Sequence, residues 1–431
     1  MQPQRHAGKV SSWSSWHTAP VRRIRYGELA RTIWSAFPPM AGAAAAASVA
    51  WWAITAGSHI DTAVFRDAAQ EVLQGRSPYF LPSDVPFVYP PAGLLVTLPT
   101  AIGSNFRVAT MVWLAISIAA LGRATWILVD LAWPTLDVGQ LRRRTCWLFA
   151  AACLLEPTLI TLSFGQVGLV LFWLIVEGLR GQPRHTTRAW LVGLAAAAKL
   201  TPVVVLVGLA AAGRWRSAFW GMVGFVGASA AAAAISPAAV SDYVGGAWRL
   251  ARDVNSTPDV LNHSLIGVTA LVDLPAWVGL TGAAMALVLG IALTAALWRH
   301  GDELAGLSTV LVTGLLVSPV SWPHHWVAIY PSLVLLLREA RNRRVWAVIL
   351  LSTAIVGMLL WVDEAGLPGS RVLEPGDAWR VPQREWYLVW GVALLGWSAA
   401  ALLTGRAEKQ PRSSGATSGS NALDAQAPPT A

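Results

Sequence analysis

Long runs of apolar residues with almost no charge dominate the chain, and they limit it to a membrane fold. Apolar side chains make up 55% of the 431 residues, and charged ones only 13%. An ordinary soluble domain carries about 25% charged residues, so the charges here are too few to cover a water-facing surface. The 24 tryptophans and 26 prolines suit interfacial anchors and interrupted helices in a bilayer. These features predict an all-α polytopic membrane protein and exclude a soluble enzyme, a disulfide scaffold and a disordered chain.

The apolar runs predict about 12 transmembrane helices, since a span needs roughly 20 mostly apolar residues and fewer where half-helices meet inside the protein. The expected spans are 38–57, 106–131, 145–162, 166–180, 189–199, 200–213, 217–236, 275–298, 304–320, 326–338, 345–362 and 387–405. The stretch 90–104 is apolar but short and interrupted by proline. We expect it to dip into the bilayer without crossing, because a further crossing would change the topology.

Basic residues gather at one end of the predicted spans. With the N-terminus in the cytoplasm, 22 of the 32 lysines and arginines fall on the cytoplasmic side. The expected outer loops, 58–89, 237–265 and 363–386, hold seven basic and twelve acidic residues. This distribution satisfies the positive-inside rule. The net charge of +9 therefore indicates a topology with both termini in the cytoplasm, and it does not indicate nucleic-acid binding.

Three regions follow from this topology. A basic arm over 1–37 precedes the membrane domain over 38–405, and a Ser/Gly/Ala/Pro-rich tail over 406–431 is expected to be disordered. No cleavable signal peptide is expected, because the first apolar run begins only near residue 38. In the first outer loop, apolar residues recur with helical spacing from Thr62 to Leu73, which predicts an interfacial helix.

Polar residues that interrupt the apolar segments fall on the outer side. Asp61 lies just beyond the first span, and the later breaks are Phe164-Gly165-Gln166, Lys199-Leu200-Thr201-Pro202, Asn262-His263-Ser264-Leu265 and the run from Ser318 to Trp326. Irregular backbone at membrane depth must line a cavity. Together with the last outer loop, these six segments predict an active-site chamber at the outer interface.

A chamber that holds a carboxylate, histidines, a lysine and amides suits the transfer of a group from a lipid phosphate. A carboxylate can deprotonate an acceptor hydroxyl, and cations or N–H groups stabilise charge on a leaving phosphate. A neutral histidine can exchange hydrogen bonds with either partner. The sequence near these residues offers no ligand set with metal-binding spacing, so no metal is expected.

Each of these residues also has a simpler interpretation. Asp61 can be an ordinary helix-end carboxylate, and His324-His325 can be an interfacial pair beside Trp322 and Trp326. Lys199 can extend its side chain to the interface, although a lysine inside an apolar hairpin is costly and favours a phosphate or carboxylate partner. The residues alone leave these alternatives open.

The same motifs, in the same order, resemble glycosyltransferase family 87. The resemblance runs from about residue 55 to 335 and is carried by Asp61, Tyr79, Tyr89-Pro90-Pro91, Phe164-Gly165-Gln166, Lys199-Leu200-Thr201-Pro202, Asn262-His263-Ser264-Leu265 and Ser318-Pro319-Val320-Ser321-Trp322-Pro323-His324-His325-Trp326. Members of this family are polytopic mannosyltransferases of actinobacterial envelopes with the C-type glycosyltransferase fold. They take mannose from polyprenyl-phosphate-mannose and form α-1,2 linkages. Two positions depart from the pattern: Gly168 stands where asparagine is common, and His263 stands where glutamine is usual.

The resemblance implies roles for individual residues. Asp61 would be the catalytic base, a histidine would assist it, with His325 preferred to His324, and Lys199 would lie near the donor phosphate. The other residues expected to bind substrate are Gln166, Asn262, His263, Tyr89, Trp322 and Arg380. A β-linked donor and an α-linked product imply one inverting displacement, at the outer face of the plasma membrane.

The expected partners are the polyprenyl-phosphate-mannose donor, a phosphatidylinositol mannoside acceptor and membrane lipid, with no cofactor and no nucleic acid. Branching of lipomannan or lipoarabinomannan is the alternative within the family. A lipid-linked sugar transporter would share the broken helices and buried charges, but neither half of this chain repeats the other. A scaffold subunit would leave Asp61, Lys199 and His325 without a shared role.

Overall fold

The computed structural model describes residues 26–81, 85–102, 105–250, 261–342, 344–360 and 385–404. The described residues form helices joined by short connections. Five helices are long and apolar enough to cross a membrane: α1 (Tyr26–Ala56, of which Phe37–Ala56 is apolar), α4 (Phe106–Ala132), α10 (Trp215–Ile235), α14 (Ala276–His300) and α19 (Trp386–Leu403). A sixth crossing results if the bent pair α5 (Val138–Cys153) and α6 (Glu156–Phe164), which meet at 68°, is one span. The chain is therefore an all-α, multi-span membrane protein.

Shorter helices fill the rest of the bundle. Six of them fall within expected spans: α7 (Gly168–Leu179), α8 (Trp190–Ala198), α9 (Val203–Ala211), α15 (Glu303–Val317), α16 (Tyr330–Arg341) and α17 (Val345–Leu360). Each of α8 and α9 has nine residues, about 14 Å of helix, which is less than half of a bilayer core of about 30 Å. Every expected span thus contains a helix, and the count of 12 crossings stays a prediction.

One expected boundary differs from the structure, and the stretch 90–104 contains brief helices. Helix α1 begins at Tyr26, well before residue 38, because the helix continues from the apolar segment into the basic arm, through Pro38 and Pro39. In the described part of the stretch 90–104, the helices are α3 (Gly93–Thr97) and the single turn η1 (Leu98–Ala101). Both are much shorter than a bilayer core of about 30 Å, and the dipping segment stays a prediction.

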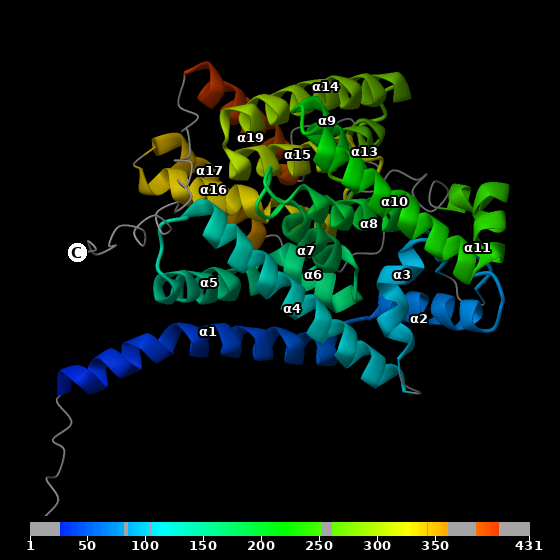
Figure 1. Cartoon of the computed structure of the whole chain (residues 1–431), viewed down its shortest axis with the longest axis horizontal. Helices are drawn as coiled ribbons and strands as arrows, with labels where there is room; N and C mark the ends of the chain where they lie inside the picture. Colours follow the sequence, from blue (N-terminus) through cyan, green and yellow to red (C-terminus); the bar gives the residue numbers. More distant parts are fainter. Residues whose placement is uncertain are drawn as a thin grey trace, which may run out of the picture.

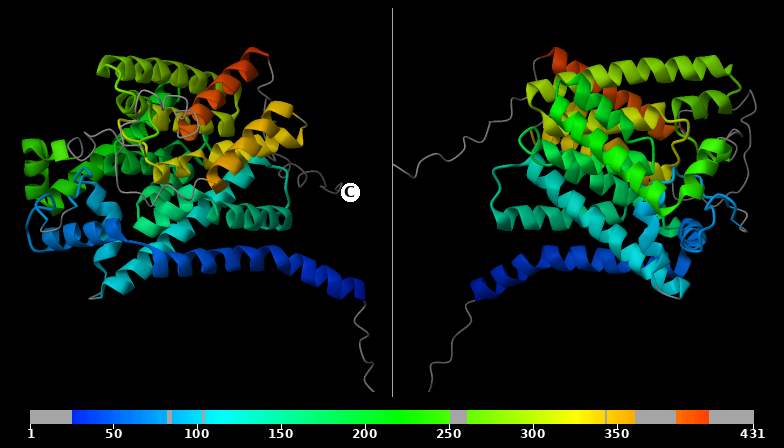
Figure 2. Two further views of the ribbon diagram at one scale, coloured as in Figure 1. Left: turned by 180° about the vertical axis from the view of Figure 1, so that it is seen from behind. Right: turned by 45° about the vertical axis from the view of Figure 1, so that its right-hand side comes forward.

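Helix α2 (Ile60–Leu73) matches the helix predicted in the first outer loop. It lies beyond the end of α1 together with α3 and α11 (Pro237–Asp242), at the right of Figure 1. In the right-hand view of Figure 2, α2 is seen end-on while α1 and α4 are seen along their length, so α2 runs across the spans. Its apolar face is buried by the protein itself, because Phe65 packs edge-on against Tyr89 and Trp113.

The bundle has two distinct ends (Figure 1). Helix α1 lies along one side of it and α14 along the opposite side. The first residues of α1 and the junction of α16 with α17 lie at the end remote from α2 and α3. Arg338 and Arg341, two of the arginines that determined the expected topology, lie in the last turn of α16 at that remote end.

Candidate active site

Asp61 stands in the first turn of α2, where the helix dipole favours a carboxylate. The chain reaches it from α1 through the short connection 57–59, in which His59 adopts a left-handed conformation, with φ of 49°. The backbone N–H of His59 donates to the carbonyl oxygen of Ser163 at 2.8 Å. This hydrogen bond ties the start of α2 to the hairpin between α6 and α7, so Asp61 lies beside the residues at that hairpin's tip.

Gln166 and Tyr89 connect to Asp61 through side-chain hydrogen bonds. The hydroxyl of Tyr89 donates to Oε1 of Gln166 at 2.9 Å, which leaves the amide N–H of Gln166 to donate to the Asp61 carboxylate. Both Gln166 and Tyr89 are buried. Their positions are held from further away, since the Tyr79 hydroxyl donates to the carbonyl oxygen of Tyr89 at 2.9 Å.

The hairpin tip is shaped by Gly165, which follows the last residue of α6. It has φ of 72°, the left-handed conformation in which glycine commonly ends a helix. A Cβ at this position would lie 1.7 Å from Oγ1 of Thr62, the residue after Asp61. The carbonyl oxygen of Gly165 also accepts a hydrogen bond from Nε1 of the buried Trp113 at 2.7 Å. Only glycine allows this close approach of α2 to the hairpin.

Lys199 lies at the break between α8 and α9. Helix α8 ends at Ala198, Lys199 is extended with φ of −148°, and Pro202 precedes the first residue of α9. The ammonium Nζ of Lys199 lies 5.7 Å from the centre of the Tyr89 ring, a distance typical of a cation–π contact. Tyr89 therefore contacts Lys199 through its ring and Asp61 through Gln166.

His325 completes the group. It belongs to the short helix η4 (Pro323–Ile329), and its Nε2 lies 2.7 Å from Nζ of Lys199. Trp322 stacks against its ring, with centroids 6.1 Å apart and planes inclined by 23°. His324 is adjacent, with ring centroids 4.3 Å apart, but it is buried and its Nε2 has no hydrogen-bond partner among the described residues.

A backbone contact indicates which nitrogen of His325 carries its hydrogen. The N–H of Trp322 donates to Nδ1 of His325 at 3.2 Å, so in the neutral ring the hydrogen is on Nε2. Nε2–H and the Lys199 ammonium are then both donors, and two donors facing each other at 2.7 Å satisfy neither. An anion in the cavity that both side chains line can accept a hydrogen bond from each of them. This geometry is suited to a phosphate oxygen.

Burial changes the acid strength of Asp61. Desolvation raises the pKa of its carboxyl to about 6, against the opposing effects of the Gln166 hydrogen bond and the positive charge of Lys199. A carboxylate with a pKa near the working pH can both take up and release a proton. Asp61 therefore has the properties of a general base.

Two predicted site residues have another role in the structure. The side chain of His263 has no exposed surface, and its Nδ1 lies 3.1 Å from Oε2 of Glu385, so its observed partner is a carboxylate and its contact with substrate stays a prediction. Asn262 is also buried, and it bonds to the backbone of Pro319 and Ser321. Both residues support the segment that leads to η4. Arg380 lies outside the described residues.

Sequence reasoning missed the residues that hold the site together. Trp113, Thr62 and Glu385 carry no motif of their own, and their importance is visible only from their partners. Two carboxylates inside the bundle, Glu156 and Glu177, both have partners: the Tyr387 hydroxyl donates to Glu156 at 2.7 Å, and Glu177 pairs with Arg123 at 2.8 Å. In the described part of the chain, no group of three or more His, Cys, Asp or Glu residues is placed to hold a metal ion.

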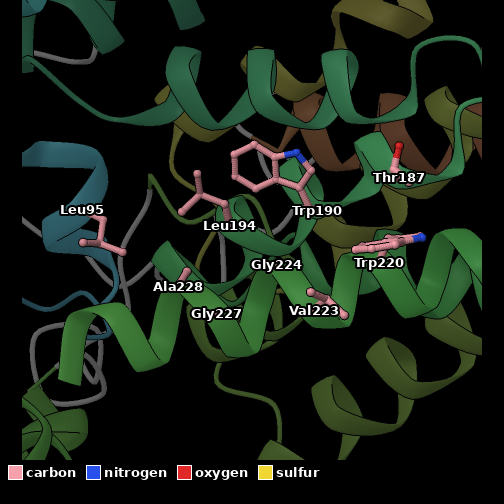
Figure 3. Close-up of a pocket in the computed structure, with 9 residues that line it drawn as sticks. All are labelled: Leu95, Thr187, Trp190, Leu194, Trp220, Val223, Gly224, Gly227 and Ala228. Carbon is pink, nitrogen blue, oxygen red and sulfur yellow. The ribbon is translucent and has the colours of Figure 1, made fainter. Parts of the chain in front are cut away.

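Two apolar cavities among the described residues differ in how they relate to this polar group. One begins at Lys199 and His325 and continues between α7, α9 and α15, where Leu171, Phe172 and Leu311 line it. The other is an open groove between α8 and α10, with Trp190 and Trp220 at its wall (Figure 3). No ionisable side chain lines that groove. Only the first cavity joins the polar group.

Comparison with known proteins gives consistent matches. The family model for glycosyltransferase family 87 matches residues 87–319. A Mycobacterium tuberculosis protein named polyprenol-phosphate-mannose-dependent alpha-(1-2)-phosphatidylinositol pentamannoside mannosyltransferase is 30% identical, over 74% of this chain and 74% of its own length. Its namesake from Mycolicibacterium smegmatis is 31% identical, over 73% of this chain and 77% of its own. A Mycobacterium tuberculosis alpha-(1-2)-phosphatidylinositol mannoside mannosyltransferase with the same donor in its name is 27% identical, over 90% and 93%. No solved structure matches significantly.

Proposed function

This chain belongs to glycosyltransferase family 87, and we propose that it transfers mannose from polyprenyl-phosphate-mannose to a mannose hydroxyl of a phosphatidylinositol mannoside, forming an α-1,2 linkage. The observation that carries the proposal is that one polar group joins a half-buried carboxylate, Asp61, to a cation and a histidine, Lys199 and His325. The names of the relatives supply the donor and the class of acceptor.

The reaction is a single displacement with inversion. The acceptor oxygen forms a bond to C1 of the donor mannose while the bond from C1 to the phosphate oxygen breaks. Asp61 takes the proton of the acceptor hydroxyl, and the polyprenyl phosphate leaves with the bonding electrons. Lys199 and the Nε2–H of His325 donate hydrogen bonds to the phosphate, where negative charge grows in the transition state. Gln166 holds the Asp61 carboxylate in orientation.

The lipid chain of the donor extends from this phosphate into the apolar cavity between α7, α9 and α15. That cavity is lined by Lys199 and His325 at one end and by aliphatic and aromatic side chains beyond them, which matches a phosphate attached to a hydrocarbon chain. The groove of Figure 3 lies on α10 and contacts neither Lys199 nor His325. We therefore assign the start of the donor chain, next to the phosphate, to the first cavity.

The active site lies on the extracytoplasmic side of the plasma membrane in this proposal. Asp61 follows the end of α1 opposite to the one that carries the basic arm, and the positive-inside rule puts that arm in the cytoplasm. The family implies the C-type fold, and the short helices complete twelve crossings by meeting at the polar breaks.

The deciding experiment supplies polyprenyl-phosphate-mannose to membranes that contain the protein, together with purified phosphatidylinositol tetramannoside, pentamannoside or lipomannan. We expect a mannosylated phosphatidylinositol mannoside whose new linkage is removed by an α-1,2-mannosidase. A product only from lipomannan would move the acceptor to the branching reaction. Movement of the donor across vesicles without any transfer product would favour the transporter instead.

The rate of transfer is expected to depend on pH through Asp61. The base must be ionised, so activity should fall as the pH decreases through about 6, the pKa to which burial raises this carboxyl. The donor is a phosphodiester and stays ionised over this range. Measurement of kcat/KM against pH checks the prediction. In Gln166→Leu the acidic limb should move to higher pH, because a hydrogen bond that lowers the Asp61 pKa is lost. If the limb did not move, the acidic limb would not report the ionisation of Asp61.

Replacement of Gly165 by alanine is expected to reduce transfer by on the order of 100-fold, the effect of misplacing a reacting group by about 1 Å. The added Cβ overlaps Thr62 and would push the start of α2 away from the hairpin. Gly213→Ala is the matched control, since it also has positive φ, 78°, but a Cβ there meets no atom within 4 Å. Equal activities for the two variants would show that the close approach at Thr62 is unimportant.

A further inference from the structure

A cluster of buried polar side chains lies at the start of α19, outside the group assigned to the reaction. Glu385, directly before α19, has its Oε2 3.1 Å from Nδ1 of His263. Two residues later, the Tyr387 hydroxyl donates to Oε2 of Glu156 at 2.7 Å. None of the four is more than 2% exposed. We call these four residues the α19 clamp.

The α19 clamp is costly for stability. Ionisable groups in an apolar interior lose their hydration, and a single partner for each does not restore it. One oxygen of Glu156, one of Glu385 and Nε2 of His263 have no hydrogen-bond partner within the described ranges. Apolar side chains of similar size could fill the same volume without this cost. A role beyond stability is therefore needed to account for the cluster.

The contacts of the clamp lead to the segment that carries His325. The backbone N–H of His263 donates to the carbonyl oxygen of Ser321 at 3.0 Å. The same oxygen accepts a hydrogen bond from Nε1 of Trp326 at 3.3 Å. The Tyr387 ring packs against Trp326, with centroids 4.9 Å apart, and against His263 at 5.1 Å. Ser321 and Trp326 thus hold both ends of the turn that contains His325.

We infer that the α19 clamp positions His325 for the transfer reaction. By holding Ser321 and Trp326, it fixes the turn in which the Trp322 N–H contacts Nδ1 of His325 and Nε2 faces Lys199. In the described part of the chain, no clamp residue contacts Asp61 or Lys199 directly. The positioning residues are therefore Glu385, His263 and Tyr387. The inference rests on the proposed function only in taking His325 to act on the donor phosphate.

A double-mutant cycle between Glu385 and His325 tests this. Glu385→Leu is expected to lower kcat on the order of 10- to 100-fold, with KM for the donor little changed, since Lys199 remains. In a His325→Ala background, the same change should cost less than about 2-fold, because residues that act through one another are not additive. Glu385→Gln should keep most of the activity, as its amide oxygen still accepts a hydrogen bond from His263.

Glu339→Leu is the control for loss of a buried carboxylate. Glu339 is 2% exposed and pairs with Arg338 and Arg344 on the arginine-rich end of the bundle, so its loss should lower thermal stability and leave kcat per folded molecule unchanged. The inference is overturned if the losses from Glu385→Leu and His325→Ala are additive, or if Glu385→Leu lowers only the thermal midpoint.

Tyr387→Phe provides a second variant should Glu385→Leu not fold. It keeps the ring against Trp326 and removes only the hydrogen bond to Glu156, and it should show a smaller loss of kcat with the same non-additivity. Additive losses in that cycle would overturn the inference as well. Absence of transfer by the wild-type protein would instead refute the proposed function, so the two failures are distinguishable.

Discussion

Asp61→Asn should lower the rate of mannosyl transfer by about 10²- to 10⁴-fold, the range that loss of a general base produces. Asparagine has the size of aspartate, and its side-chain oxygen still accepts the hydrogen bond from Gln166. The amide cannot take up the acceptor proton. Because the donor phosphate is bound by Lys199 and His325 in our proposal, KM for the donor should change little while kcat falls.

The matched control for Asp61→Asn is Asp67→Asn on the same helix. Asp67 is half-buried on α2 and is also a carboxylate, but none of its contacts joins it to Gln166 or Lys199. It should retain wild-type activity. The thermal midpoint of both variants in detergent, with and without polyprenyl phosphate, shows that each is folded and binds the leaving group. Loss of a general base should reduce the rate at least about 100-fold. If Asp61→Asn kept more than about a tenth of the activity, another group would have to accept the proton.

The breaks that form the site were predictable because each carries its signal in adjacent residues. Gly165 ends a helix, Pro202 begins one after Lys199, and Pro323 begins η4, so the sequence marks each corner locally. The helix from Thr62 to Leu73 was visible from its apolar spacing. Since all these breaks fall on one side of the charge-based topology, their meeting could be expected before their distances were known.

The orientation of His263 could not be predicted from its motif. It lies between Asn262 and Ser264 in a run that resembles a substrate-binding motif, but its side chain is paired with Glu385, 122 residues further along the chain. Which face of such a turn meets the chamber is decided by the helix that packs behind it, here α19. A contact between such distant residues leaves no trace in the spacing of either segment.

The number of membrane crossings is difficult to predict from the sequence for a related reason. A span is recognised by about 20 apolar residues, whereas α8 and α9 have nine each. Such helices are stable at membrane depth only because neighbours bury their ends, and α8 is indeed buried along most of its length. Both helices are too short for a length criterion, and the break between them brings the Lys199 side chain beside Tyr89 and His325.

Lys199→Met should reduce transfer by about 10²- to 10³-fold, the loss expected when one group that stabilises a developing anion is removed. Methionine is unbranched and apolar, so it can pack over the Tyr89 ring as the lysine does. A lysine ammonium group at membrane depth is energetically costly, and the substitution removes it. The variant should therefore be at least as thermally stable as the wild type while it loses activity.

That combination separates a phosphate-binding lysine from one that only extends to the interface. Lys199→Arg should recover part of the activity, since it restores the charge but not the position of the donor relative to His325. Arg188→Met, which removes a cation near Glu177 at the opposite end of the bundle, should leave transfer unchanged. Initial rates at several donor concentrations, with thermal midpoints for all three variants, decide the matter. If Lys199→Met transferred mannose at the wild-type rate, His325 alone would have to hold the phosphate, and the 2.7 Å approach of these two side chains would need another explanation.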